Sequence, residues 1–179
     1  MKKLLIGALV GGVLLFFWQF LSFTVLDLHR PMQEHTPKQA EILKYLSENL
    51  EEGNYYLPTL PAGASWEEND KVMQEGMGKP WAQVFYHKAM ATDMTANMLR
   101  GLFVAILAVL AVAWVLMKIT KNSLSTSVLS CIAIGLASYL TTSYATCIWY
   151  ETITLPDLID AILGWGVVGV WLGWWLNRD

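Results

Sequence analysis

Four long apolar segments constrain this chain more than any other feature of its sequence. They cover residues 4–26, 99–117, 128–149 and 158–176, and each is long enough to cross about 30 Å of hydrocarbon as an α-helix. The 179 residues are 55% hydrophobic and 15% charged, whereas charged residues make up about a quarter of a typical soluble domain. The sequence therefore predicts an all-α integral membrane protein built on a bundle of four transmembrane helices.

The basic residues near these segments are sorted to one side. Two lysines follow the first methionine, Lys118 and Lys121 lie between the second and third segments, and Arg178 follows the fourth. Basic residues that flank transmembrane helices favour the cytoplasm. We therefore expect a multi-pass protein with both termini in the cytoplasm and residues 27–95 outside it.

The connection between the third and fourth segments is acidic. It carries Glu151, Asp157 and Asp160 and no Lys or Arg, as expected for a loop outside the cytoplasm. The four segments place no Asp, Glu or His at mid-membrane depth, where proton- or cation-coupled transporters normally carry such a group. The sequence therefore argues against that class of transporter.

The first segment imitates a signal peptide, because lysines precede its apolar run. It is longer than the usual apolar region of about 7–15 residues, and no small-x-small cleavage site follows it, so we expect it to remain as a span.

Cys131 and Cys147 both fall in the third segment, too far apart along one helix for a disulfide. Residues 27–95 contain neither cysteine nor an Asn-x-Ser/Thr acceptor, which favours a bacterial plasma (inner) membrane.

Residues 27–95 have the signals of a small α+β domain. Pro37 after Thr36 predicts a helix that begins there and covers residues 38–50. Ser65 with Glu68 predicts a capping box that opens a second short helix.

The same region predicts a pair of strands. Residues 81–86 are aromatic and β-branched, and we expect them to pair with residues 55–57. The region contains eleven Asp or Glu and six Lys or Arg, a balance that argues against a nucleic-acid partner.

Small residues mark the faces on which the spans are expected to pack. Glycines four residues apart in the first and fourth segments, and small hydroxyl residues on one face of the third, let helices approach closely. The fourth segment carries Trp171, Trp174 and Trp175 opposite its glycines, where an aromatic belt is expected. The predicted helix-packing residues are Gly7, Gly11, Ser130, Ser138, Thr141, Thr142, Gly166, Gly169 and Gly173.

Aromatic residues concentrate in the two predicted strands. Such residues form the core of a small domain, and exposed ones are enriched at interaction hot spots. The candidate partner surface consists of Tyr55, Tyr56, Trp81, Phe85, Tyr86 and His87.

No sequence motif nominates a catalytic residue, a cofactor or a metal ligand. The three histidines, His29, His35 and His87, lack the helical spacing of a metal site, and no nucleophile elbow, phosphate loop or dinucleotide-binding motif is present. An enzyme that acts at the outer surface through these histidines remains an alternative.

We therefore expect a non-enzymatic membrane protein that serves as an accessory or assembly subunit of a cell-envelope complex, with membrane lipid, other membrane subunits or its own copies as partners. The alternative is a small-solute or lipid transporter or channel lined by the Ser/Thr face of the third span.

Overall fold

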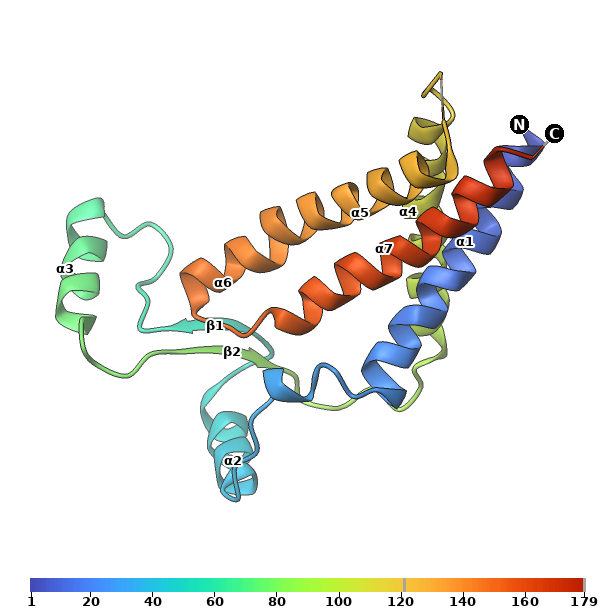
Figure 1. The fold of residues 1–179 in the computed structure, drawn as a ribbon. Helices are drawn as coiled ribbons and strands as arrows, with labels where there is room; N and C mark the ends of the chain where they lie inside the picture. Colours follow the sequence, from blue (N-terminus) through green and yellow to red (C-terminus); the bar gives the residue numbers. More distant parts are fainter. Residues whose placement is uncertain (121, 179) are drawn as a thin grey trace. The chain divides into compact units, whose positions relative to one another are not determined.

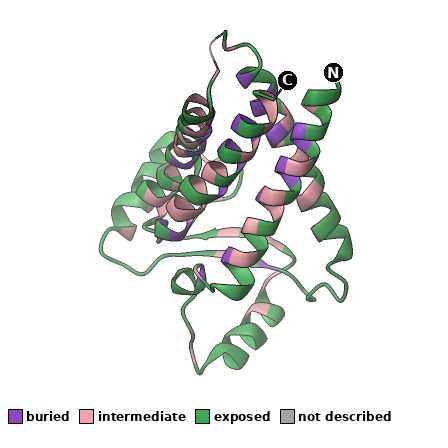
Figure 2. Cartoon of the chain, turned by 45° about the vertical axis from the view of Figure 1, so that its right-hand side comes forward, coloured by how far each residue is buried: buried purple, intermediate pink, exposed green. Residues whose placement is uncertain are grey.

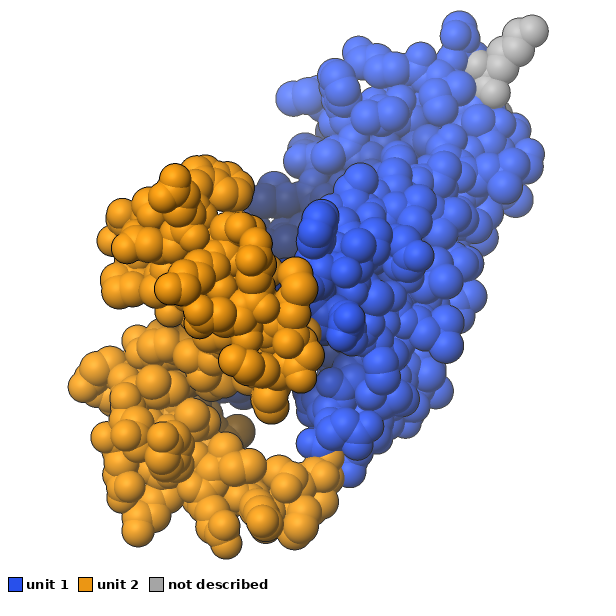
Figure 3. Space-filling view, turned by 90° about the vertical axis from the view of Figure 1, so that its left-hand side faces the viewer, with its two compact units in different colours: residues 1–34, 93–179 blue, residues 35–92 orange. Residues whose placement is uncertain are grey.

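The computed structural model of this chain describes residues 1–120 and 122–178, so that Lys121, one of the basic residues used above, lies outside the described residues. The fold is mostly helical, at 68%, with one small two-stranded sheet. It divides into two compact units, each described here by itself (Figure 3). Unit 1 comprises residues 1–34 and 93–179, and unit 2 comprises residues 35–92.

Unit 1 contains four helical segments that are long and apolar enough to cross a membrane. The prediction of four long apolar helices is therefore confirmed for the described residues, 1–120 and 122–178. The segments are α1 (Lys2–Phe20) with the π-helical turn η1 (Leu21–Val25); α4 (Thr95–Leu116); α5 (Leu124–Tyr139) continued by the π-helical turn η3 (Leu140–Tyr144) and α6 (Ala145–Tyr150); and α7 (Leu155–Leu176). A short 3-10 helix, η2 (Arg30–Met32), follows the first of them.

These helices pack in the order α4–α1–α7–α5, and α4 and α5 barely touch one another. Figure 1 shows α4 and α5 diverging from the short loop that joins them. The two termini lie beside each other at the same end of unit 1 as that loop. The two helices are therefore farther apart at the opposite end of unit 1.

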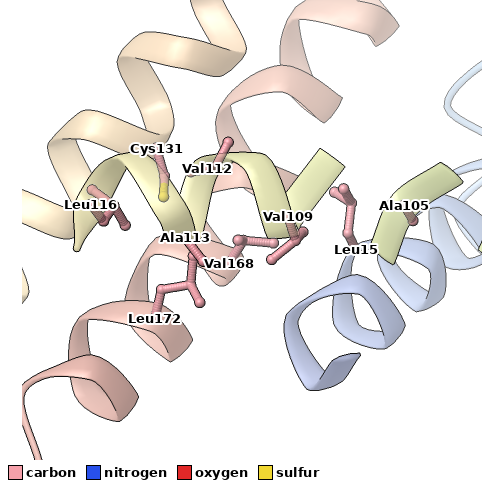
Figure 4. Close-up of a cluster of buried hydrophobic side chains, with 9 residues drawn as sticks. All are labelled: Leu15, Ala105, Val109, Val112, Ala113, Leu116, Cys131, Val168 and Leu172. Atoms are coloured by element: carbon pink, nitrogen blue, oxygen red, sulfur yellow. The ribbon is translucent and has the colours of Figure 1, made fainter. Parts of the chain in front are cut away.

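An apolar core fills the half of unit 1 that is nearer the termini. Figure 2 shows that most buried residues of unit 1 lie in this half of its helices. Side chains from all four long helices meet there (Figure 4). The core consists of Leu15, Ala105, Val109, Val112, Ala113, Leu116, Cys131, Val168 and Leu172.

The acidic connection between the third and fourth segments is shorter than the sequence suggested. Helix α7 begins at Leu155, three residues before the expected span, and Pro156 lies in its first turn. Asp157 and Asp160 are therefore residues of α7, and assigning them to a loop was wrong. The reason is that proline is tolerated in a first helical turn, where its missing N–H is not needed, and acidic residues are favoured there.

Unit 2 consists of two short helices and a sheet of two antiparallel strands, with one helix between the strands along the chain. They are α2 (Gln39–Asn49), β1 (Gly53–Leu57), α3 (Trp66–Gly76) and β2 (Ala82–Tyr86). The strands pair antiparallel, with Tyr55 opposite Val84, which confirms the predicted pairing.

The capping box that opens α3 is also confirmed. The Ser65 hydroxyl accepts a hydrogen bond from the Glu68 backbone N–H at 3.2 Å, and the Glu68 carboxylate accepts one from the Ser65 backbone N–H at 2.8 Å. The Ser65 hydroxyl also donates to this carboxylate at 2.9 Å. The two bonds that the carboxylate accepts lower its pKa, and the bond from the Ser65 backbone N–H has the larger effect. The prediction of Thr36 as the cap of α2 was wrong: Lys38 occupies the cap position, and the Thr36 hydroxyl accepts only from the Lys38 N–H at 3.3 Å.

Candidate binding site

A cavity of about 450 Å³ lies within unit 1, in the half farther from the termini. All four long helices contribute to its wall, and it adjoins the side where α4 and α5 diverge. Its polar lining consists of Trp18, Gln19, His29, Ser138, Tyr139, Thr142, Ser143, Asp157 and Asp160. Its apolar lining includes Leu15, Phe23, Gly101, Val104, Ala105, Ala108, Gly135, Ala161 and Trp165. We name it the His29 cavity.

The Asp160 carboxylate is the centre of the polar lining. Its Oδ2 lies 2.9 Å from Nε2 of His29, and its Oδ1 accepts a hydrogen bond from the indole N–H of Trp18 at 3.0 Å. The His29 and Asp160 side chains are only 10% and 18% exposed. Because a carboxylate withdrawn from water is costly unless donors surround it, these two contacts explain how α7 tolerates Asp160.

The His29 ring is held on three sides. Phe23 stacks on it with ring centroids 3.6 Å apart and an interplanar angle of 8°. Its Nδ1 lies 3.3 Å from the sulfur of Met32, while its Nε2 faces Asp160. Both ring nitrogens therefore face groups that accept hydrogen bonds.

The end of α1 explains how His29 reaches the cavity. The helix widens into η1, and the N–H of Leu28 donates to the carbonyl of Ser22 at 3.0 Å. Asp27, with φ at +48°, adopts the left-handed conformation that commonly ends helices. This turn reverses the chain and returns His29 to the bundle.

Two further contacts fix the wall formed by α5 and α7. The hydroxyls of Tyr139 and Thr154 are hydrogen bonded at 3.0 Å. A Cβ atom on Gly135 would lie 2.5 Å from the carbonyl oxygen of Ala161 and 2.5 Å from the Trp165 ring. Only glycine lets α5 approach α7 this closely, so the position of Trp165 in the cavity wall depends on Gly135.

The predicted glycine positions lie at helix contacts, with one exception. A Cβ atom on Gly7 would lie 3.0 Å from the Trp175 ring, and one on Gly11 would lie 2.8 Å from Val109. On α7, Gly169 faces the backbone of α5 and Gly173 faces Leu124 and Ser127. Gly166 differs, because the nearest atom to its Cβ position is 3.9 Å away, on Ile132.

The predicted hydroxyl residues of the third span differ in whether they line the His29 cavity. Ser138 and Thr142 line the His29 cavity, whereas Thr141 does not. The hydroxyls of Thr141 and Thr142 donate to carbonyls of their own helix, at 2.7 Å to Ala137 and Ser138 respectively. Ser130 is partly buried in α5 and lines no part of the cavity.

The tryptophans of α7 hydrogen bond to α1. The indole N–H of Trp171 donates to the Gly7 carbonyl at 2.9 Å, and that of Trp175 donates to the Lys3 carbonyl at 2.8 Å. Arg178 lies over the Trp174 ring at 4.3 Å. Two of the three rings thus join helices, a role that the sequence analysis did not assign to them.

The candidate partner surface of unit 2 is divided between the two faces of the two-stranded sheet. Residues alternate along paired strands, so Tyr55 and Tyr86 share one face, while Tyr56 and Phe85 share the other. Tyr86 is buried and Phe85 is 62% exposed. The Tyr56 and Trp81 rings lie 5.6 Å apart, and His87 contacts the Glu52 carboxylate at 2.9 Å.

The histidines do not assemble a metal centre in the described part of the chain. Among residues 1–120 and 122–178, no group of three or more His, Cys, Asp or Glu side chains is placed to hold a metal ion. His29 belongs to unit 1, and His35 and His87 belong to unit 2. Cys131 and Cys147 are both free, as predicted.

The pairing of His29 with Asp160 was not predicted, because 131 positions separate the two residues. A local signal was Pro156 followed by an acidic residue, which marks a helix start before the expected span of 158–176 and places Asp157 on the same helix as Asp160. Comparisons with protein-family models, with curated proteins and with solved structures found nothing that matches this chain. The function must therefore be inferred from the residues of the site.

Proposed function

We propose that this chain is a non-enzymatic multi-pass membrane protein that binds a small polar solute or a lipid headgroup in the His29 cavity. The observation that carries the proposal is a cavity of about 450 Å³ that has two carboxylates and a histidine in its lining, among helices that are otherwise apolar. Polar groups are costly at such a position, and within membranes they mark substrate and ion pathways. With both termini in the cytoplasm, as the basic residues predict, the cavity would lie in the outer half of the bilayer.

The apolar core favours binding or carriage over an open channel. Leu15 and Ala105 belong both to the cavity wall and to the core that continues toward the termini. Leu116, Val168 and Leu172 are fully buried within that core. A solute in the cavity would have to displace these side chains to pass through, so transport would require the helices to rearrange.

The geometry of His29 supports a non-enzymatic role. A histidine that serves as a general base must present a nitrogen to the group it deprotonates. Here Nε2 faces Asp160 and Nδ1 faces Met32. Neither nitrogen is directed at a hydroxyl of the cavity.

Native mass spectrometry of protein extracted gently from its own membrane tests the proposal. Replacing Ser138, which lines the cavity, with phenylalanine should fill the space, and Ala137→Phe on the neighbouring exposed residue is the matched control. We expect the parent chain and Ala137→Phe to retain a solute or lipid that Ser138→Phe loses. Equal retention by all three, or no retained species, would overturn the proposal.

A second candidate is the accessory or assembly subunit expected from the sequence. An apolar groove of about 610 Å³ includes Gly166, Ile132, Leu14 and Trp174 in its lining. Gly166 is a small residue whose space no neighbouring helix fills, as expected of a position kept for another helix. Mild crosslinking followed by purification should then capture a second subunit through the parent chain and lose it with Gly166→Leu. A strictly monomeric parent chain would remove this candidate.

A further inference from the structure

We propose that the His29 cavity recognises a positively charged ammonium group, a ligand class that deepens the proposed function and rests on it. The charge of the lining is the first argument. Among the described residues that line the cavity, Asp157 and Asp160 supply two carboxylates and none is Lys or Arg. Acidic side chains therefore outnumber basic ones in this lining.

The two carboxylates are not equivalent. Asp160 already accepts from Trp18 and contacts His29. Asp157 lines the same cavity, and among the described residues no hydrogen bond or ion pair involves its side chain. It lies in the first turn of α7, whose dipole stabilises its charge without neutralising it. Asp157 is thus the carboxylate available to a bound cation.

The aromatic walls are the second, independent argument. Trp18, Trp165, Tyr139 and Phe23 all border the cavity. An ammonium group gains energy from the face of an aromatic ring, and such rings combined with carboxylates are a recurring way to bind amines and quaternary ammonium ligands. An anionic ligand would find no Lys or Arg among the described residues of this lining.

The ammonium group has two sources, a free amine or the headgroup of a phospholipid, and the experiment separates them. The full chain is reconstituted in nanodiscs of phosphatidylglycerol, which carries no amine. One arm adds free ethanolamine, and the other includes phosphatidylethanolamine in the discs. Binding is measured from the shift in thermal unfolding temperature and from the lipid retained in native mass spectrometry.

We expect one of the two probes to bind, and Asp157→Asn to weaken that binding about tenfold, the effect of removing one charged hydrogen-bond partner. Glu151→Gln is the matched control, because it removes an exposed carboxylate that lies outside the cavity lining. It should leave the binding unchanged. Since Asp157 has no partner in the described structure, its replacement is not expected to disturb folding.

Three outcomes would overturn the inference. Binding that Asp157→Asn and Glu151→Gln weaken equally would assign it to general surface charge. Inositol and inorganic phosphate are added to the same discs as competing probes. If either binds in preference to the amines, and Ser138→Phe abolishes that binding, the ammonium ligand is refuted and the proposed function stands. No binding of any probe, together with no species lost from Ser138→Phe, would refute both.

Discussion

His29 and Asp160 satisfy one another where little water reaches them, and their contact links the turn after α1 to α7. Replacing either residue with leucine leaves its partner in a largely buried position without its hydrogen bond. We expect a coupling energy of about 1–3 kcal/mol between His29→Leu and Asp160→Leu. The lost acceptor of Trp18 affects the Asp160 variant and the double variant alike, so it cancels from the cycle.

The measurement is the free energy of unfolding of the parent chain, the two single variants and the double variant in mixed micelles. A double variant that is destabilised by the full sum of the single effects would show that the two side chains act independently.

Two buried serines should respond to alanine in opposite directions. The Ser127 hydroxyl donates to Oδ1 of Asn122 at 2.9 Å, whereas the Ser22 hydroxyl is buried and has no hydrogen-bond partner in the described part of the chain. An unsatisfied buried hydroxyl carries a cost of about 1–3 kcal/mol. Ser22→Ala should therefore raise the unfolding temperature, and Ser127→Ala should lower it. A loss of stability in Ser22→Ala would mean that its hydroxyl is satisfied in the folded protein.

At the scale of whole helices, the contact between α5 and α7 depends on Gly169. A Cβ atom there would lie 2.7 Å from the Val128 Cα, and backbone cannot move aside as a side chain can. We expect Gly169→Ala to cost about 1–3 kcal/mol through overpacking. Gly166→Ala is the control on the same helix, because its Cβ would meet no atom nearer than Ile132 at 3.9 Å and alanine favours helix by up to about 1 kcal/mol. Unfolding in mixed micelles measures both, and equal effects would contradict the packing argument.

The helices and their glycine spacing could be predicted because each depends on a short stretch of sequence. The turn that returns His29 could not, since η1 and the left-handed Asp27 have no distinctive local pattern. The π-helical turn η3 likewise interrupts the regular spacing on which a hydroxyl face extending through Thr142 was predicted. Thr141 consequently lies outside the cavity that Thr142 lines.

For unit 1 as a whole, the sequence predicted the number of helices but not which of them leave a space. The order α4–α1–α7–α5 follows from which faces of each helix fit together, and hydropathy does not encode it. Four apolar helices with charges near their ends suit a closed bundle as well as an open one. The His29 cavity depends on the separation of α4 and α5. Its lining comes from segments that are far apart in the sequence, so the cavity is recognised only from the three-dimensional structure.

The ends of unit 1 predict how the whole molecule would lie in a membrane. The two termini and the α4–α5 loop are at one end, where Lys118 lies 5.4 Å from the Trp114 ring and Arg178 lies over Trp174. Basic residues beside aromatic rings are typical of a cytoplasmic interface. We therefore expect Ser47→Cys in unit 2 to react with a membrane-impermeant maleimide in intact cells. Lys118→Cys should react only after permeabilisation.

The labelling is carried out in a parent chain with Cys131→Ala and Cys147→Ser, which should not react in either condition. Ser47 is exposed on α2 and its hydroxyl only donates to the Lys44 carbonyl, so a cysteine there leaves the fold unchanged. The reverse labelling pattern would place the termini outside and move the His29 cavity to the cytoplasmic half. Labelling of both positions in intact cells would show that α4 does not cross the bilayer. Helix α4 lies between Ser47 and Lys118 along the chain, so the two positions can be on opposite sides only if α4 crosses.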